Sequence, residues 1–183
     1  MRFLIKFSYD GTNYCGYQKQ PGLATIEGKM EEALTKINNG KKTSITATGR
    51  TDKKVHALAQ YAHADIDVNI TENKLKRALN SNIPDDIHVI ETKIVEDNFH
   101  ARYNVKEKTY KYIINLGEYN PIERNYVFQY NYKLDIKAIR EGIKYFEGTH
   151  DFRAFVTDNK EKENCVRTCL LYTSDAADDR ISV

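Results

Sequence analysis

The segment GRTDKKVHA, residues 49–57, combines residue types that could do chemistry. Its only acid is Asp52, and its cations are Arg50, Lys53 and Lys54. If a guanidinium lies within hydrogen-bond reach of Asp52, it lowers the pKa of the carboxyl group and keeps it ionised. An ionised carboxylate on a loop can act as a nucleophile or stabilise developing positive charge. The same spacing also fits an ordinary turn whose aspartate caps the backbone and faces water, so both interpretations stand on spacing alone.

The positive charge of the chain is concentrated around this segment. The formal net charge is only +2, but residues 1–60 hold ten Lys or Arg against five Asp or Glu. Residues 61–183 hold 18 against 21. A local excess of cations suits a phosphate-bearing partner such as nucleic acid, although surfaces of this kind also occur without one.

Other chemistries lack the residues that they need. No Cys/His set has the spacing of a zinc site, and no glycine-rich turn resembles a nucleotide-binding motif. We therefore expect no metal and no cofactor. No apolar run is long enough to cross a bilayer, and the three cysteines form no disulfide pattern, so we expect no membrane partner and a cytoplasmic protein.

The elements that must position Asp52 follow from hydrophobic periodicity. Alternating residues predict a strand over 2–9, and a helical stripe after Thr25 predicts a helix that stops before Gly40. Asp52 then lies between expected strands at 44–48 and 55–68. The remaining expected elements are a helix capped by Thr71, a strand over 87–95, a strand over 106–116 and a helix capped by Asp135 with Ile136, Ile139, Ile143 and Phe146 facing inward.

This order predicts an α+β protein made of two ferredoxin-like units, with mainly antiparallel sheets and helices on one face. We expect the first unit at 1–104 and a partial second unit at 105–170. Residues 171–183 lack core periodicity and resemble translated sequencing-adapter sequence more than the end of a domain, so we expect a non-native tail there.

Several sequence blocks together carry a resemblance to a known family. The Asp52 block is Gly49-Arg-Thr-Asp52 with Val55-His56-Ala57 and Gln60. The others are Tyr9-Asp-Gly-Thr, Gly16-Tyr-Gln-x-Gln20, Thr25-Ile-Glu27, Asn80 through Pro84-Asp-Asp-Ile87, Phe99-x-Ala-Arg102, Lys108-x-Tyr110-x-Tyr112 and Gly148-Thr-His-Asp-Phe152. In this order, over residues 3–170, the chain resembles the tRNA pseudouridine synthase A family.

The resemblance implies a cofactor-free isomerase with the pseudouridine synthase fold. Such an enzyme converts uridine to pseudouridine in the anticodon arm of tRNA, at positions 38 to 40, and works as a homodimer. The family's nucleophile falls on Asp52, its neighbouring arginine on Arg50, and the tyrosine that contacts the target base on Tyr110. Further contacts to the RNA are expected at Gln18, Lys53, Lys54, His56 and Arg102.

Two departures from the family pattern affect this interpretation. The family usually has a small residue and a glycine after the aspartate, where this chain has Lys53 and Lys54. If that glycine needs a positive φ, Lys54 is strained; if it does not, the two lysines simply add phosphate contacts. The family's C-terminal blocks are also absent, so we expect a truncated chain that lacks part of its active site. The alternatives are a non-catalytic RNA-binding fragment of the same fold and a carboxylate-dependent nucleoside hydrolase.

Overall fold

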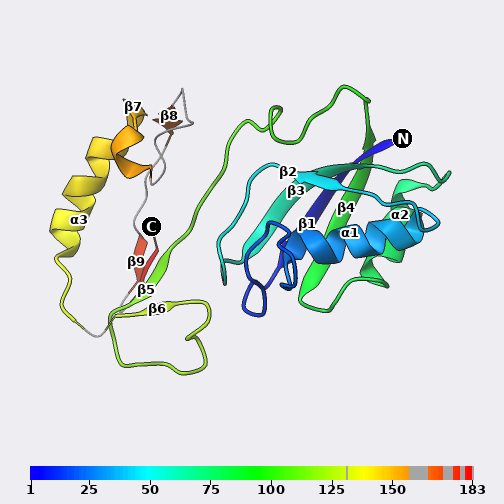
Figure 1. Cartoon of the computed structure of the whole chain (residues 1–183). Coiled ribbons are helices and arrows are strands. Elements are labelled where there is room, and N and C mark those ends of the chain that lie inside the picture. The colour runs from blue at the N-terminus through cyan, green and yellow to red at the C-terminus, as the bar shows by residue number, and fades with distance from the viewer. Residues whose placement is uncertain (131, 157–164, 171–174, 178–179, 183) are drawn as a thin grey trace. The chain divides into compact units, whose positions relative to one another are not determined.

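The computed structural model divides into two compact units, Met1–Lys108 and Thr109–Val183 (Figure 1). The structure describes residues 1–130, 132–156, 165–170, 175–177 and 180–182. No helix within these ranges is long and apolar enough to cross a membrane.

The first unit is a four-stranded antiparallel sheet with two helices. Its strands lie in the order β2-β3-β1-β4. Along the chain, the β–α–β–β–α–β succession and this strand order are those of a ferredoxin-like unit. The elements are β1 (Arg2–Tyr9), α1 (Ile26–Ile37), β2 (Ile45–Ala47), β3 (Ala57–Asp65), α2 (Glu72–Asn80) and β4 (Ile87–Val95).

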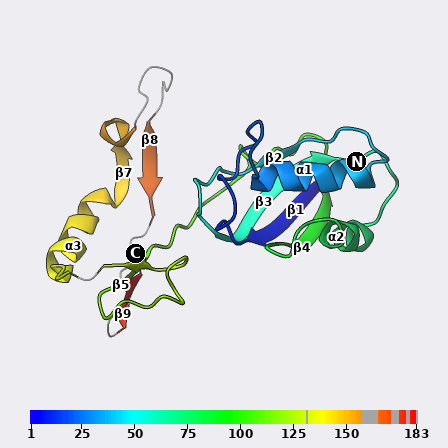
Figure 2. The same cartoon turned by 60° about the horizontal axis from the view of Figure 1, so that its bottom comes forward.

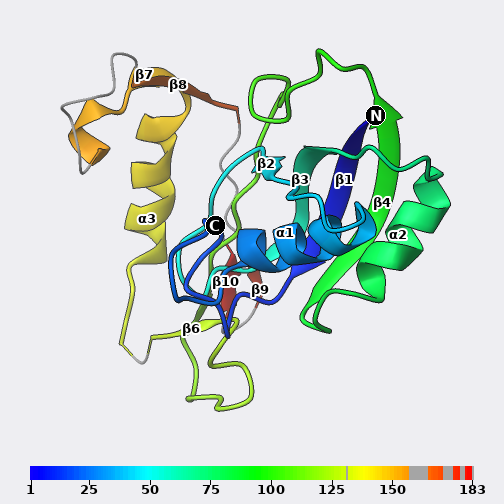
Figure 3. The same ribbon diagram turned by 45° about the vertical axis from the view of Figure 1, so that its right-hand side comes forward.

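Both helices cover one face of this sheet (Figure 3). Every second residue of β1 is buried because side chains alternate between the two faces of a strand. The helices meet this face with residues spaced three and four apart, which share one side of a helix. The core consists mainly of Phe3, Ile5, Phe7 and Tyr9 of β1, Ile26, Met30 and Leu34 of α1, and Leu75 and Leu79 of α2.

Two of the three expected N-caps form a side-chain hydrogen bond in the structure. At the start of α3 (Ile136–Ile143), the Asp135 side chain accepts from the Ala138 backbone N–H at 2.9 Å. The Thr25 side chain accepts a hydrogen bond from the Gly28 backbone N–H at 3.3 Å, as expected of a cap at the start of α1. Thr71 occupies the N-cap position of α2 but makes no side-chain cap hydrogen bond. The expected side-chain cap at Thr71 is therefore wrong, although the helix begins where the sequence predicts.

A change of register lies next to the loop that carries Asp52. Phe7 of β1 pairs with Gln60 of β3, but Tyr9 pairs with Ala57, so β3 has one extra residue in this stretch. An extra residue bends the strand and re-aims the side chains beside it. The bulge therefore sits where β3 emerges from the Asp52 loop.

The second unit has smaller sheets. One sheet has the strand order β6-β5-β10-β9, in which β5 and β6 are parallel, and β7 pairs with β8 antiparallel. Figure 2 shows α3 and the β7–β8 pair. The elements are β5 (Ile113–Asn115), β6 (Phe128–Gln129), α3 (Ile136–Ile143), a 3₁₀ turn at Lys144–Phe146, β7 (Gly148–Asp151), a 3₁₀ turn at Arg153–Phe155, β8 (Val166–Cys169), β9 (Asp175–Ala177) and β10 (Arg180–Ser182).

The α+β class is confirmed, but the expectations for the second unit hold less well. The strand expected over 106–116 covers only Ile113–Asn115. The α3 helix has no buried residue, so its expected inward face is at most partly covered. Aromatic alternation in 106–116 predicts a strand only if a neighbouring strand pairs with it, and β10 and β6 pair only with residues 113–115. A second ferredoxin-like unit is not confirmed.

Truncation of an aliphatic helix residue should destabilise the protein more in the first unit than in the second. Leu34 is fully buried in α1, so we expect Leu34→Ala to lower the free energy of unfolding by about 2–5 kcal/mol. Ile139 of α3 is only partly covered, so Ile139→Ala should cost less than about 1 kcal/mol. Urea denaturation followed by circular dichroism measures both. Equal losses in the two variants would contradict the difference in packing.

Candidate active site

The Asp52 loop connects β2 to β3, and a buried glutamine fastens its first residues. Gln60 is 7% exposed. Its Nε2 donates to the Gly49 carbonyl at 3.0 Å, and its Oε1 accepts from the Thr48 hydroxyl at 2.7 Å. One amide side chain thus holds two consecutive residues, because it carries a donor and an acceptor on neighbouring atoms.

Two buried tyrosines hold the residue just before Asp52. The Thr51 hydroxyl and the Tyr9 phenol oxygen are hydrogen-bonded at 2.8 Å. The Thr51 carbonyl accepts from the Tyr17 backbone N–H at 3.0 Å. Burial raises the pKa of both phenols, so they remain neutral at physiological pH. Thr51 is therefore fixed through its side chain and its backbone.

Two glycines let the loop between β1 and α1 contact the backbone of the Asp52 loop. A Cβ on Gly11 would lie 2.1 Å from the Val55 carbonyl oxygen, which no side chain can do. A Cβ on Gly16 would lie 3.1 Å from the Thr51 carbonyl oxygen, and Gly16 has a φ of +96°. These positions need glycine because the backbones of the two loops are in direct contact.

The carboxylate of Asp52 itself is exposed. The Asp52 carbonyl accepts from the Val55 N–H at 3.2 Å, which closes a tight turn, and the side chain faces solvent. Arg50 is also exposed, and in the described part of the chain no hydrogen bond or ion pair joins it to Asp52. The ion pair expected from the sequence is therefore not formed in this structure, in which both side chains are exposed to solvent.

His56 ties the end of the loop to the turn after β1. Its Nδ1 lies 2.9 Å from Asp10 Oδ1 and 3.1 Å from the Gly11 backbone nitrogen. The Gly11 N–H can donate to Nδ1 only when that nitrogen is unprotonated, and Asp10 can accept from it only when it is protonated. The imidazole therefore keeps a partner in either protonation state.

Lys54 has the backbone conformation that a glycine would favour. Its φ is +66°, in the left-handed region that costs a residue with a Cβ about 1–3 kcal/mol. The sequence-based expectation of strain at this position is confirmed. The neighbouring Lys53 has no such conformation, although both side chains are exposed.

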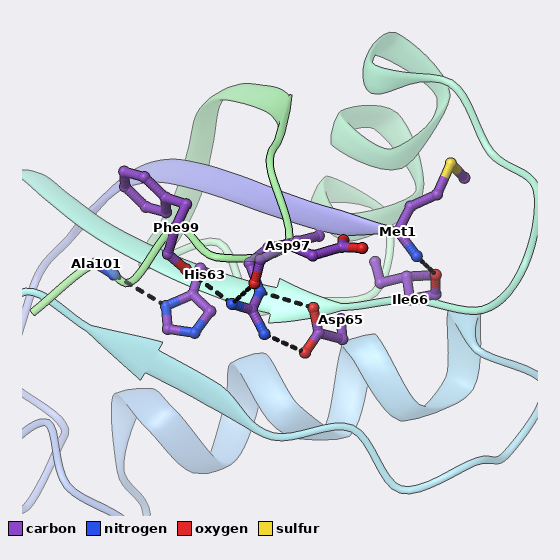
Figure 4. Close-up of polar contacts among 8 residues, drawn as sticks. Met1, His63, Asp65, Ile66, Asp97, Phe99 and Ala101 are labelled. Atoms are coloured by element: carbon purple, nitrogen blue, oxygen red, sulfur yellow. Dashed lines mark hydrogen bonds and ion pairs between the residues drawn. The ribbon is translucent and has the colours of Figure 1, made fainter. Parts of the chain in front are cut away.

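Arg102 follows Ala101, and Figure 4 shows the Ala101 backbone fastened to His63 near the other end of β3. Arg2 forms a two-point ion pair with Asp65, with N···O distances of 2.9 and 2.8 Å, and donates to the Phe99 carbonyl at 2.8 Å. The Ala101 N–H donates to His63 Nδ1 at 3.1 Å. His63 is six residues along β3 from Ala57, so the backbone beside Arg102 is attached about 20 Å from the start of β3. The structure does not bring Arg102 beside Asp52.

The remaining expected site residues are also exposed. Gln18 lies in the loop that contacts Thr51 through Tyr17. Tyr110 is 75% exposed and belongs to the second unit. The structure therefore groups Asp52 with Lys53, Lys54, His56 and the loop of Gln18, all within the first unit.

Sequence reasoning did not select two residues that the structure places at the loop. Gln60 belongs to the Asp52 motif, and a polar residue among the small apolar residues of β3 is a signal for a buried amide. Lys108 Nζ lies 3.2 Å from the position that a Cβ on Gly49 would occupy. No local pattern links Lys108 to Gly49, because the two are 59 residues apart.

The site as a whole is an acid in a basic surrounding. Asp52 is presented to solvent on a loop with three exposed cations, Arg50, Lys53 and Lys54, and the Lys108 amine lies beside Gly49. Such a field attracts a phosphate-bearing molecule and leaves one carboxylate available for chemistry on it.

Comparison with known proteins agrees with this combination. A family model described as tRNA pseudouridine synthase matches residues 5–104, which include the whole Asp52 loop. The tRNA pseudouridine synthase A of Pseudothermotoga lettingae is 45% identical over 168 residues, which cover 91% of this chain and 68% of that protein. The tRNA pseudouridine synthase A of a Geobacillus species is 38% identical, covering 96% and 71%. The tRNA pseudouridine synthase A 1 of Bacillus cereus is 41% identical, covering 98% and 73%.

The family model spans most of the first unit, including Asp52, and the relatives are 38–45% identical to the chain. Together these matches define the class of the protein. The chain belongs to the tRNA pseudouridine synthase family.

The strain at Lys54 gives a prediction with a matched control. Lys54→Gly should raise the free energy of unfolding by about 1 kcal/mol, because glycine adopts the left-handed region without a steric cost. Lys53→Gly removes the same charge at a position without positive φ and should lower it by a few tenths to about 1 kcal/mol. Urea denaturation of the two variants measures the difference. A loss of stability in Lys54→Gly as large as in Lys53→Gly would contradict the strain.

The stability of the first unit should also depend on the protonation of His63. Burial, then the charges of Arg2 and His100, lowers the pKa of His63 below its usual value, and Asp65 opposes this only in part. The unfolded chain therefore binds the proton more readily, so stability is full above about pH 6.5 and falls as the pH drops through the folded-state pKa. His63→Asn should flatten this dependence between about pH 7 and pH 5, since an amide does not titrate. Identical pH dependence in wild type and variant would contradict a role for His63.

Proposed function

We propose that this protein isomerises uridine to pseudouridine in the anticodon arm of tRNA, at positions 38 to 40, with Asp52 as the nucleophile. The observation that carries the proposal is the Asp52 loop. Its backbone is fixed at Gly49 and Thr51 by buried groups, while the carboxylate faces solvent among cations. That arrangement occurs in a chain of the tRNA pseudouridine synthase family.

The reaction needs few groups and no cofactor. The N1–C1′ bond of uridine breaks, the uracil turns, and C5 forms a new bond to C1′. The proton from C5 passes to solvent and N1 gains a proton, so the atoms balance. A carboxylate can serve by attacking C6 of the base or C1′ of the ribose, and it is regenerated when the new bond has formed.

The uridine must first leave the helical stack, and unpairing and unstacking the base costs roughly a few kcal/mol. Cations offset this cost by binding the phosphates on either side of the target. Lys53 and Lys54 directly follow Asp52 and are exposed, so they suit this role. Arg50 has no ion pair with Asp52 here, and we propose that it turns toward the acid or the vacated stack when RNA binds.

The other expected contacts lie beside the Asp52 loop, farther along the first unit or on the second unit. Gln18 and His56 border the Asp52 loop and would contact the nucleotide or its neighbours. The backbone beside Arg102 is attached to His63, far along β3 from the Asp52 loop. Arg102 therefore suits a phosphate farther along the anticodon arm. We propose that Tyr110, which is exposed, stacks on the target base or takes the C5 proton, and that the active protein is a homodimer.

The proposal predicts that tritium is released from tRNA labelled at C5 of uridine. Asp52→Ala should reduce this release at least about 10³-fold, because it removes the attacking group. Asp85→Asn removes an exposed acid in the turn before β4 and should leave release unchanged. Release and its loss are measured as radioactivity that no longer adsorbs with the RNA.

The same assay separates the alternatives. Binding of tRNA with no release of tritium by the wild-type chain would favour a non-catalytic RNA-binding protein. Free uracil in the supernatant would favour a nucleoside hydrolase. Undiminished release in Asp52→Ala would rule out Asp52 as the nucleophile.

A further inference from the structure

One buried side chain of β3 fastens the start of the Asp52 loop. Gln60 is buried on β3, three residues after the strand begins, directly beside the register shift between β1 and β3. Its amide reaches across to Thr48 and Gly49, which lead into the loop from β2. Gly49 is three residues from Asp52.

The two polar atoms of the amide have different tasks. Oε1 accepts from the Thr48 hydroxyl at 2.7 Å and from the Tyr61 N–H at 3.1 Å. Nε2 donates to the Gly49 carbonyl at 3.0 Å. Only the Nε2 contact holds the loop's own backbone at Gly49, and no other described hydrogen bond to that carbonyl is present.

This contact cooperates with the one at Thr51. Tyr9 and Tyr17 hold Thr51, so the chain is fastened on the N-terminal side of Asp52 at positions 49 and 51. On the other side the exposed lysines have no such fastening, and Lys54 is strained. The next fastened position on that side is His56, four residues after Asp52. Slack at Gly49 therefore changes the direction of the Asp52 carboxylate.

We infer that Gln60 is a positioning residue for Asp52: its Nε2–H···O=C bond to Gly49 sets the direction in which the carboxylate meets the nucleotide. The inference rests on the proposed role of Asp52. Gln60 touches no substrate in this account and acts only through the loop backbone.

The first test removes the donor while the shape is kept. Gln60→Met should lower kcat for tritium release about 10- to 100-fold, the size expected when a reacting group is misplaced by about 1 Å. KM for tRNA should stay within about twofold, because the exposed cations that bind phosphate are unchanged.

Asn80→Leu is the matched control. Asn80 at the end of α2 also makes two hydrogen bonds through one amide, to the Val89 carbonyl at 2.9 Å and from the Val89 N–H at 2.7 Å, but on β4 and away from the loop. We expect it to lower the melting temperature as Gln60→Met does, with kcat unchanged. Equal kcat losses in the two variants, or a wild-type kcat in Gln60→Met, would overturn the inference.

A conservative variant separates positioning from stability. Gln60→Glu keeps the acceptor, but its side chain can donate to Gly49 only when the carboxyl group is protonated, and burial raises the pKa of that group. The kcat of Gln60→Glu per folded molecule, relative to wild type, should therefore rise as the pH is lowered from about 8 to about 6. A buried carboxyl group with a raised pKa gains its proton in this range. A ratio that is constant over this range would count against the donor role.

Trypsin gives a readout that does not need activity. Lys53 and Lys54 are exposed in the loop, so cleavage after them reports how far the loop opens. Gln60→Met should be cut there several-fold faster than Asn80→Leu, and equal rates would overturn the inference even if wild-type protein released no tritium. Absent release by the wild type would instead count against the proposed function.

Discussion

The arrangement of the first unit depends on one physical constraint: a loop must hold a solvent-facing carboxylate without exposing the polar groups that fasten it. The loop solves this with buried neutral groups, namely the Gln60 amide and the phenol of Tyr9. A carbonyl left without its donor in such a place costs about 1–3 kcal/mol, so the contacts at Gly49 and Thr51 are costly to break. Charge remains on the outside, where water solvates it.

Much of this framework could be predicted from the sequence. The β1 alternation, the stripe on α1 and the bounds of β4 follow from local periodicity, since each buries one face against the same core. Asp52 and the strained Lys54 could be singled out because their neighbours in the chain are unusual. The class of reaction came from many sequence blocks in one order, and the relatives agree with it.

What could not be predicted depends on contacts between distant residues. The Arg50–Asp52 ion pair looked natural from spacing, but both side chains are exposed to solvent in the structure. Gln60 and Lys108 lie beside Gly49 only in the folded chain, Gln60 from β3 and Lys108 from the segment between β4 and β5. In the second unit, the aromatic alternation over 106–116 met no paired neighbour before residue 113, so most of the expected strand did not form. Periodicity indicates which face is apolar but not whether another element covers it.

The central claim is that the Asp52 loop belongs to the same cooperative structure as the sheet. The Tyr17 N–H tests it most directly, because it donates to the Thr51 carbonyl at 3.0 Å and lies outside any helix or strand. Amide hydrogen exchange followed by NMR should show Tyr17 protected to nearly the same degree as the central amides of β1. Exchange of the Tyr17 amide at the rate of an unprotected loop amide would show that the loop opens independently and would contradict the account.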